Sequence, residues 1–197
     1  LKIVGGYSAG CLGVGANPSV LNGDDSGTVL SLDTAAGQTS GSIRVENLYI
    51  TNGSAAQGGG LAIVTNTGDV TLVNNIVTGN TASEIGGGIS LRAHGAAQTL
   101  LIANNTIDFN EGGGIYCNSA VTPPVILNNI ITNSPAGEGV RAEGAVPDSD
   151  YNNFWNNEGG GYNDPAFQGD HDISTDPLFV NAVIGEFGLQ TASPCVD

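Results

Sequence analysis

The chain has 197 residues, enough for one domain with a buried core, and its 40% hydrophobic content excludes a disordered polypeptide. Only 12% of the residues are charged, which disfavours a helical surface. Four Lys and Arg residues against 19 Asp and Glu residues give a formal net charge of −15. Such a charge repels phosphate-rich partners, so we expect no nucleic acid partner, and no stretch is long enough for membrane insertion.

The first expected element is an irregular first coil over residues 1–41. Its strands are predicted around Val20 and over residues 28–32, where β-branched and aliphatic residues gather. Leu1 already reads as mid-domain sequence, so we expect a trimmed chain whose targeting segment is missing.

Regular rungs are expected over residues 42–162, where two markers repeat in phase. The first is an asparagine, in steps of 28, 30, 24 and 24 residues: Asn47, Asn75, Asn105, Asn129 and Asn153. The second is a glycine cluster: residues 58–60, 86–88, 112–114, 159–161 and, in a degenerate copy, 137–139. No segment between the markers has a helical hydrophobic period. Short strands without crossover helices must stack by coiling, which predicts an all-β parallel β-helix of about six rungs with three short strands each.

The two markers have physical roles at the corners of such a coil. An inward-turned asparagine can bond the turn backbone and its neighbour one rung away, and glycine tolerates left-handed backbone at the opposite corner. Residues 163–197 lose both markers and carry Pro165, Pro177 and Pro194. This segment is therefore predicted to be a C-terminal cap over the last rung, covering its strand edges.

The run Gly86-Gly87-Gly88-Ile89, which follows residues 78–82, resembles repeats of bacterial surface β-helix proteins. These include pectate-lyase-like and polymorphic-outer-membrane-protein-like members. The segments 150–153, 176–180 and 193–197 are similar to the ends of many such repeat domains. The resemblance covers nearly the whole chain and implies a right-handed parallel β-helix that is secreted or held at the cell surface. It implies no single activity, because the superfamily holds lyases, hydrolases, epimerases and adhesins.

A pectate-lyase-like reaction needs a base and cations that neutralise a substrate carboxylate. The basic residues share no common offset from their markers: Lys2, Arg44, Arg92 and Arg141. The motifs of a polygalacturonase-like hydrolase are also missing, since neither Asp24-Asp25 nor His94 stands in a matching context. We therefore find no complete catalytic set.

Acidic residues beside the glycine corner offer the alternative of catalysis. Glu111 and Glu158 occupy the same setting, Asn-Glu-Gly-Gly-Gly, and Glu84 lies slightly earlier on its rung. If the three align, neighbours lie about 5 Å apart and acids two rungs apart about 10 Å. Glycosidases use carboxylate pairs at such spacings, calcium sites use stacked carboxylates, and solvated turn acids are the third interpretation.

The predicted cap contains a second acidic cluster. We take its four acids as candidate calcium ligands: Asp164, Asp170, Asp172 and Asp176. His171 is less suited to a zinc site, because no second histidine or cysteine stands at a ligand spacing. Turn closure by aspartate is the simpler interpretation. No cofactor is required by the sequence, and Ca²⁺ is the only cation it suggests.

Aromatic residues concentrate in the last quarter of the chain, where Trp155 and Tyr162 are candidates for a sugar-binding platform and a role in the cap core is the alternative. The leading hypothesis is an exported, non-catalytic β-helix module at the cell surface, adhesive or glycan-binding, with a polysaccharide or cell-surface glycan as partner. The first alternative is a carbohydrate-active hydrolase or lyase that uses the acids at the glycine corner. The second is a spacer within a longer chain.

Overall fold

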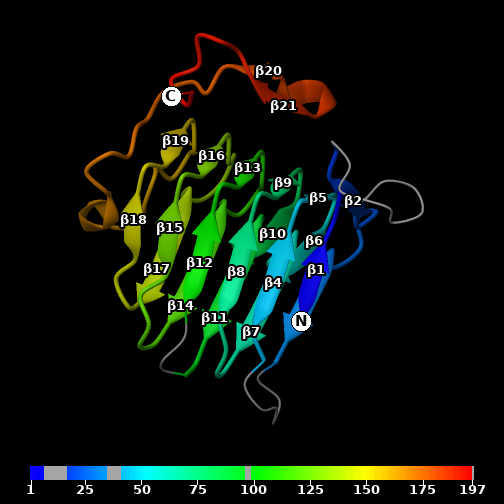
Figure 1. Ribbon diagram of the computed structural model, residues 1–197, viewed down its shortest axis with the longest axis vertical. Coiled ribbons are helices and arrows are strands. Elements are labelled where there is room, and N and C mark those ends of the chain that lie inside the picture. The colour runs from blue at the N-terminus through cyan, green and yellow to red at the C-terminus, as the bar shows by residue number, and fades with distance from the viewer. Residues whose placement is uncertain (7–16, 35–40, 96–98, 197) are drawn as a thin grey trace.

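The computed structural model describes residues 1–6, 17–34, 41–95 and 99–196, which form a coil of short parallel strands (Figure 1). Three sheets run side by side along the coil. The first sheet contains β1 (Lys2–Val4), β4 (Ile43–Glu46), β8 (Val70–Val73), β12 (Leu100–Ala103), β15 (Val125–Leu127) and β18 (Asp148–Asp150). The second contains β2 (Ser19–Asn22), β5 (Leu48–Thr51), β9 (Ile76–Thr78), β13 (Thr106–Asp108), β16 (Ile130–Thr132) and β19 (Asn153–Trp155). The third contains β3 (Leu30–Asp33), β7 (Leu61–Thr65), β11 (Ile89–Ala93), β14 (Ile115–Ser119) and β17 (Val140–Gly144).

Successive circuits of the chain add one strand to each sheet. Within the described residues this gives five complete circuits and a sixth that contributes only β18 and β19. A short parallel pair, β6 (Ser54–Gln57) and β10 (Thr81–Ile85), lies between the second and third sheets. The predicted parallel β-helix of about six rungs is therefore confirmed, and no helix among the described residues has the length and apolar character needed to cross a membrane.

The interior is a stack of aliphatic side chains. In the second sheet Val77, Ile107 and Ile131 follow one another on neighbouring strands, and each is fully buried. Phe154 closes this column at the last rung. Strand residues alternate between inside and outside, so β-branched residues at alternate positions fill the coil, each contributing roughly 1.5–3 kcal/mol by burial.

Inward asparagines form a ladder at the corner between the first and second sheets. The side-chain oxygen of Asn105 accepts bonds from the backbone N–H and the side-chain amide of Asn75, both at 3.0 Å. The same pair of bonds joins Asn105 to Asn129 and Asn129 to Asn152. The ladder ends on Asp172, which accepts from Asn152.

The ladder corrects two of the marker positions. The strand register aligns Leu48 with Asn75 and Asn152 with Asn129, so the ladder skips Asn47 and Asn153. Asn47 takes the position before the ladder, where the backbone is left-handed with φ 56°. On the sixth rung Tyr151 fills that position with φ 59°, which moves the ladder residue one place earlier than the Asn-Asn pattern predicts.

A second ladder, at the corner that follows the second sheet, was not predicted. Asn110 accepts from the backbone N–H of Asn80 at 3.1 Å and from its side chain at 3.0 Å. Ser134 takes the next position, and its own backbone N–H donates to Asn157. The ladder is therefore interrupted at Ser134.

The third glycine of the first three clusters is required by close packing between rungs. A Cβ on Gly60 would lie 2.6 Å from the carbonyl oxygen of Gly88, and one on Gly88 would lie 2.6 Å from that of Gly114. The first glycine, as at Gly86 with φ 65°, has the left-handed backbone that the sequence predicted. Glycine is therefore needed at these corners for two reasons: the left-handed backbone, and the lack of space for a side chain.

The C-terminal residues form two parts. Tyr162 bridges to Val140 and Ile173 bridges to Asn153, so the chain between them continues onto the last strands. This part holds the short 3₁₀ helix η1 (Pro165–Phe167). Residues 174–196, the C-terminal strap, then turn back along the outside of the second sheet (Figure 1).

The strap was not anticipated by the prediction of an end cap. It contains β20 (Phe179–Asn181), η2 (Ala182–Ile184) and β21 (Glu186–Leu189), with β20 and β21 antiparallel. Phe187 of β21 contacts Tyr49 of β5, with ring centroids 6.3 Å apart, and Phe179 packs edge-on against Phe187. The strap therefore reaches from the last rung back to the second.

Candidate functional site

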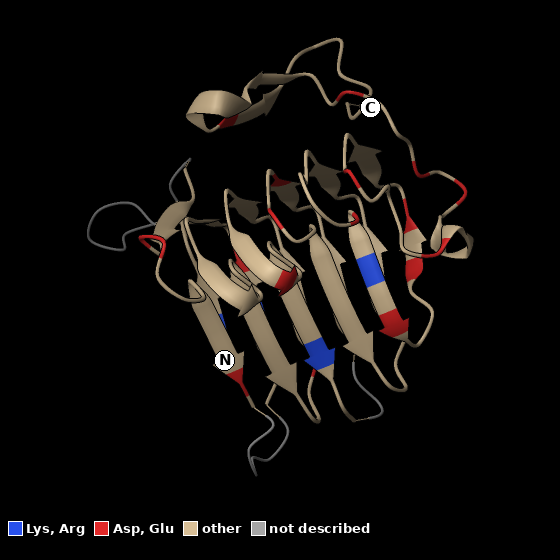
Figure 2. Ribbon diagram, turned by 180° about the vertical axis from the view of Figure 1, so that it is seen from behind, with Lys and Arg blue, Asp and Glu red and all other residues tan. Residues whose placement is uncertain are grey.

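Acidic residues lie mainly at turns and along the C-terminal segment (Figure 2). Two of the predicted acids, Glu84 and Glu111, line a common hollow of about 370 Å³. Glu138 and Arg141 line it as well, with the Arg141 guanidinium 3.6 Å from the Glu138 carboxylate. We call this space the acidic hollow.

The strand register separates the three acids of the glycine corner. Glu111 pairs with Thr81, not with Glu84, because β10 adds residues at this corner of its rung. Glu84 instead accepts a bond from the side-chain amide of Gln57 at 2.6 Å. Glu158 occupies the position equivalent to Glu111 two rungs further on, and does not line the acidic hollow. Glu84 and Glu111 therefore do not align on neighbouring rungs.

The acids of the predicted cap serve separate turns. Asp164 caps η1 by accepting from the Ala166 N–H at 2.9 Å, and Asp176 accepts from the Leu178 N–H at 2.9 Å. Asp172 ends the asparagine ladder. Over the described residues no three His, Cys, Asp or Glu side chains are grouped so that they could hold a metal ion. The fourth candidate, Asp170, lies beside His171.

The two aromatic candidates face different surroundings. Trp155 lies on the outer side of β19 and is 38% exposed. Tyr162 packs on Phe154 with ring centroids 4.6 Å apart, and its hydroxyl donates to Asp172 at 2.7 Å and contacts Ser149. Burial raises the pKa of the Tyr162 hydroxyl. Tyr162 lines a hollow of about 390 Å³ with Phe154 and the last glycine cluster, and Trp155 does not line it.

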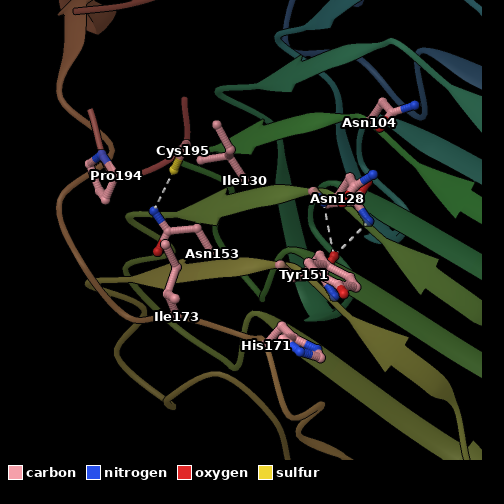
Figure 3. Close-up of a pocket in the computed structure, with 11 residues that line it drawn as sticks. Asn104, Asn128, Ile130, Tyr151, Asn153, His171, Ile173, Pro194 and Cys195 are labelled. Atoms are coloured by element: carbon pink, nitrogen blue, oxygen red, sulfur yellow. Dashed lines mark hydrogen bonds between the residues drawn. The ribbon is translucent and has the colours of Figure 1, made fainter. Parts of the chain in front are cut away.

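A larger hollow, of about 410 Å³, lies between the last rungs and the end of the strap (Figure 3). Most of its lining side chains are neutral and polar, and five of them are amides: Asn104, Asn128, Asn129, Asn152 and Asn153. Ile130, Ile173 and Pro194 supply apolar surface. We call this space the amide hollow.

One wall of the amide hollow is a column of exposed side chains from the left-handed turn positions of successive rungs. Asn104 has φ 56°, Asn128 has φ 53° and Tyr151 has φ 59°. Because these positions align from rung to rung, the side chains lie above one another at the rung spacing, about 4.8 Å. Figure 3 shows Asn128 beside Tyr151, with His171 beyond it.

Tyr151 and His171 form the end of this column. Their rings are 4.4 Å apart at the centroids with an interplanar angle of 1°. Tyr151 is 58% exposed, although a bulky residue at φ 59° carries backbone strain that asparagine and glycine avoid. Phe109 has the same strained and exposed setting outside the amide hollow, so the place of Tyr151 in the hollow is what makes its ring a candidate contact.

The opposite wall is formed by the strap. Cys195 lies there, and its sulfur accepts from the side-chain amide of Asn153 at 3.1 Å. The same asparagine donates to the Thr175 carbonyl at 2.8 Å, so it binds the strap at both of its ends. Cys117 is buried in the core as predicted, and burial raises its pKa to about 12. Cys11 lies outside the described residues.

One buried acid was not predicted. Asp108 is 5% exposed, on the outer side of β13, and accepts from the Thr132 hydroxyl at 2.7 Å and from the Asn133 amide at 2.8 Å. Burial raises the pKa of its carboxyl group, and the two donors oppose the shift.

The fold is consistent with one family. The family model described as the right-handed β-helix region matches residues 22–158, more than half of the chain, so the protein belongs to that family. No curated protein and no solved structure matches the chain.

Proposed function

We propose that this β-helix is an exported surface module that binds a neutral glycan in the amide hollow without converting it. The observation that carries the proposal is the column of Asn104, Asn128 and Tyr151, exposed beside a hollow of about 410 Å³. The exported setting rests on the resemblance to bacterial surface β-helix repeats.

The lining chemistry favours a carbohydrate. A side-chain amide both donates and accepts hydrogen bonds, as a sugar hydroxyl does, so the exposed amides of Asn104 and Asn128 can pair with hydroxyls in several orientations. Ile130, Ile173 and Pro194 offer apolar contact for the C–H faces of a sugar ring. A formal net charge of −15 disfavours an acidic polysaccharide and leaves a neutral one unopposed.

The acidic hollow supports catalysis less well. Glu84 is held by Gln57, and Glu138 lies near Arg141, so each has a polar or cationic neighbour already in place. The residues that line this hollow include no aromatic side chain that would seat a sugar against the acids. Glu111 remains the acid through which a hydrolase or lyase reaction can be tested.

Two matched substitutions test the proposed site. Tyr151 and Phe109 are both exposed aromatic residues at left-handed turn positions, with φ 59° and 52°, but only Tyr151 lines the amide hollow. Asparagine fills the equivalent position on a neighbouring rung in each column, as Asn128 and Asn133, so Tyr151→Asn and Phe109→Asn should both fold. We expect Tyr151→Asn to weaken binding about tenfold and Phe109→Asn to leave it unchanged.

The measurement is isothermal titration with cellotetraose, xylotetraose and triacetylchitotriose, followed by an assay of reducing ends for each sugar that binds. Equal losses in the two variants, or no loss in Tyr151→Asn, would exclude the amide hollow as the binding site. Release of reducing ends that Glu111→Gln abolishes would identify an enzyme instead.

A further inference from the structure

Asp150 holds the aromatic end of the amide hollow in place. One carboxylate oxygen accepts from the Tyr151 N–H at 3.0 Å and from the His171 N–H at 2.8 Å. The other oxygen is 2.8 Å from the Nδ1 atom of the His171 ring. Three contacts from a single side chain thus fix the backbone of both stacked residues and the plane of the imidazole.

This contact determines which ring nitrogen can change its role. A carboxylate only accepts, so Nδ1 of His171 carries a proton whether the ring is neutral or charged. Nε2 is then a hydrogen-bond acceptor in the neutral ring and a donor in the imidazolium. Because His171 lines the amide hollow, protonation changes the hydrogen bonds that the ring offers to a ligand there.

The charged and titratable neighbours of the His171 ring are few. Asp150 comes from β18, Tyr151 stacks on the ring, and Asp170 and Asp172 flank it in sequence. Asp172 is occupied by the ladder and by Tyr162. Across the hollow the strap contributes Cys195, whose sulfur faces Asn153.

We propose that protonation of His171 switches the amide hollow to its tight-binding state. The imidazolium presents an Nε2–H donor to the sugar oxygens, and its charge strengthens both the bond to Asp150 and the stacking on Tyr151. The neutral ring loses this donor and leaves the stacked pair less firmly held. The inference rests on the proposed glycan-binding function, and adds a regulation of the same site by pH.

The electrostatics around the ring favour its protonated form. The hydrogen bond and charge of Asp150 raise the pKa of His171, with a smaller contribution from the charge of Asp170. The hydrogen bond from His171 is also the main cause that lowers the pKa of Asp150. A raised histidine pKa means that the interaction is present at low pH and is lost as the pH rises through that value.

The first measurement follows the imidazole without any ligand. The chain has two histidines, so His94→Gln leaves His171 as the only ring to titrate by NMR. We expect Asp150→Asn to move the titration of His171 to lower pH by more than the matched change Asp170→Asn does. An equal or absent shift in the two variants would show that Asp150 does not govern the ring.

The second measurement is the affinity for cellotetraose, xylotetraose and triacetylchitotriose at about pH 5.5 and about pH 8, on either side of the usual histidine range. We expect at least one sugar to bind about tenfold more tightly at the lower pH, and His171→Gln to bind with no pH dependence. Binding that is equal at both values overturns the switch and leaves the glycan-binding function standing. Binding of none of the three sugars at either value counts against both.

Discussion

At the scale of single residues, asparagine is suited to the inner corners because one side chain serves two rungs. The amide of Asn105 donates to the Leu72 carbonyl at 2.9 Å, and its oxygen accepts twice from Asn75. Two positions depart from this pattern. Asp172 replaces asparagine at the end of the first ladder, and Ser134 replaces it where the second ladder is interrupted.

Ser134 is the weak point of the second ladder. It is 1% exposed, and its hydroxyl is the one buried side-chain oxygen or nitrogen in the described part of the chain that has no hydrogen-bond partner. We expect Ser134→Asn to restore the ladder with Asn110 and Asn157 and to raise the free energy of unfolding by about 1–2 kcal/mol. The reciprocal change, Asn110→Ser, should lower it by at least as much. Urea denaturation of both variants measures the two free energies of unfolding. A Ser134→Asn protein less stable than the parent would contradict the role given to Ser134 in the ladder.

Asp108 makes stability depend on pH in a defined direction. Its folded-state pKa lies above the unfolded value, so ionising the carboxyl group disfavours the folded state at neutral pH. This cost disappears as the pH falls through the folded-state pKa toward the unfolded value near 4. We therefore expect Asp108→Asn, which keeps an acceptor for Thr132 and Asn133, to stabilise the protein at neutral pH by about 1 kcal/mol.

Denaturation curves at about pH 7 and about pH 4 test the direction, because the advantage of Asp108→Asn should shrink at the lower value. Thr132→Val is a useful companion, because it removes one donor and should raise the cost of ionising Asp108 further. An Asp108→Asn protein that is less stable at neutral pH would show that the hydrogen bonds outweigh burial.

At the scale of elements, the sequence predicts the rungs well because each rung carries its own turn chemistry. The buried strands and the glycine corners follow from spacing alone. The exact ladder residue does not, because Asn47 and Asn74 have the same chemistry as ladder residues yet occupy the left-handed position one place earlier. Only the pairing between rungs separates the two roles, and that pairing is a property of the folded coil.

The strap escaped prediction for a related reason. Its prolines and loss of markers show that the coil ends, but the contact of Phe187 with Tyr49 joins residues more than a hundred positions apart. No local pattern specifies such a contact. The same limit applies to the amide hollow, because Asn104, Tyr151 and Cys195 meet only after the coil and the strap have both formed.

The strap should be the least stable element. Apart from Phe179 and Phe187, many of its apolar side chains face solvent, with Val183 95% exposed and Ile184 68% exposed. Because few buried contacts hold it, we expect its amides to exchange with solvent before those of the coil. Phe187→Ala should accelerate exchange in the strap and leave the second-sheet strands protected, whereas Val183→Ala should change neither.

Hydrogen exchange read by mass spectrometry resolves the two regions. Simultaneous loss of protection in the strap and in β9 and β13 of the Phe187→Ala protein would show instead that the strap and the coil unfold as one unit.

At the scale of the whole molecule, a coil of stacked rungs repeats each surface position along its length. That repetition turns single exposed side chains into columns, and the column of Asn104, Asn128 and Tyr151 is the surface that we propose for binding. The low content of basic residues and the formal net charge of −15 disfavour anionic partners at that surface. The class of fold was therefore predictable from the sequence, whereas the proposed binding surface depends on how the rungs align.

The most direct test of glycan binding in the amide hollow is an NMR titration of the ¹⁵N-labelled protein with a neutral oligosaccharide, following the asparagine side-chain amides. Asn104 and Asn128 line the amide hollow, whereas Asn52 and Asn133 hold equivalent left-handed turn positions at the other corner of the second sheet. We expect the signals of Asn104 and Asn128 to move on binding and those of Asn52 and Asn133 to stay in place. Shifts confined to Asn52 and Asn133, or to Asn110 beside Glu111, would contradict glycan binding in the amide hollow.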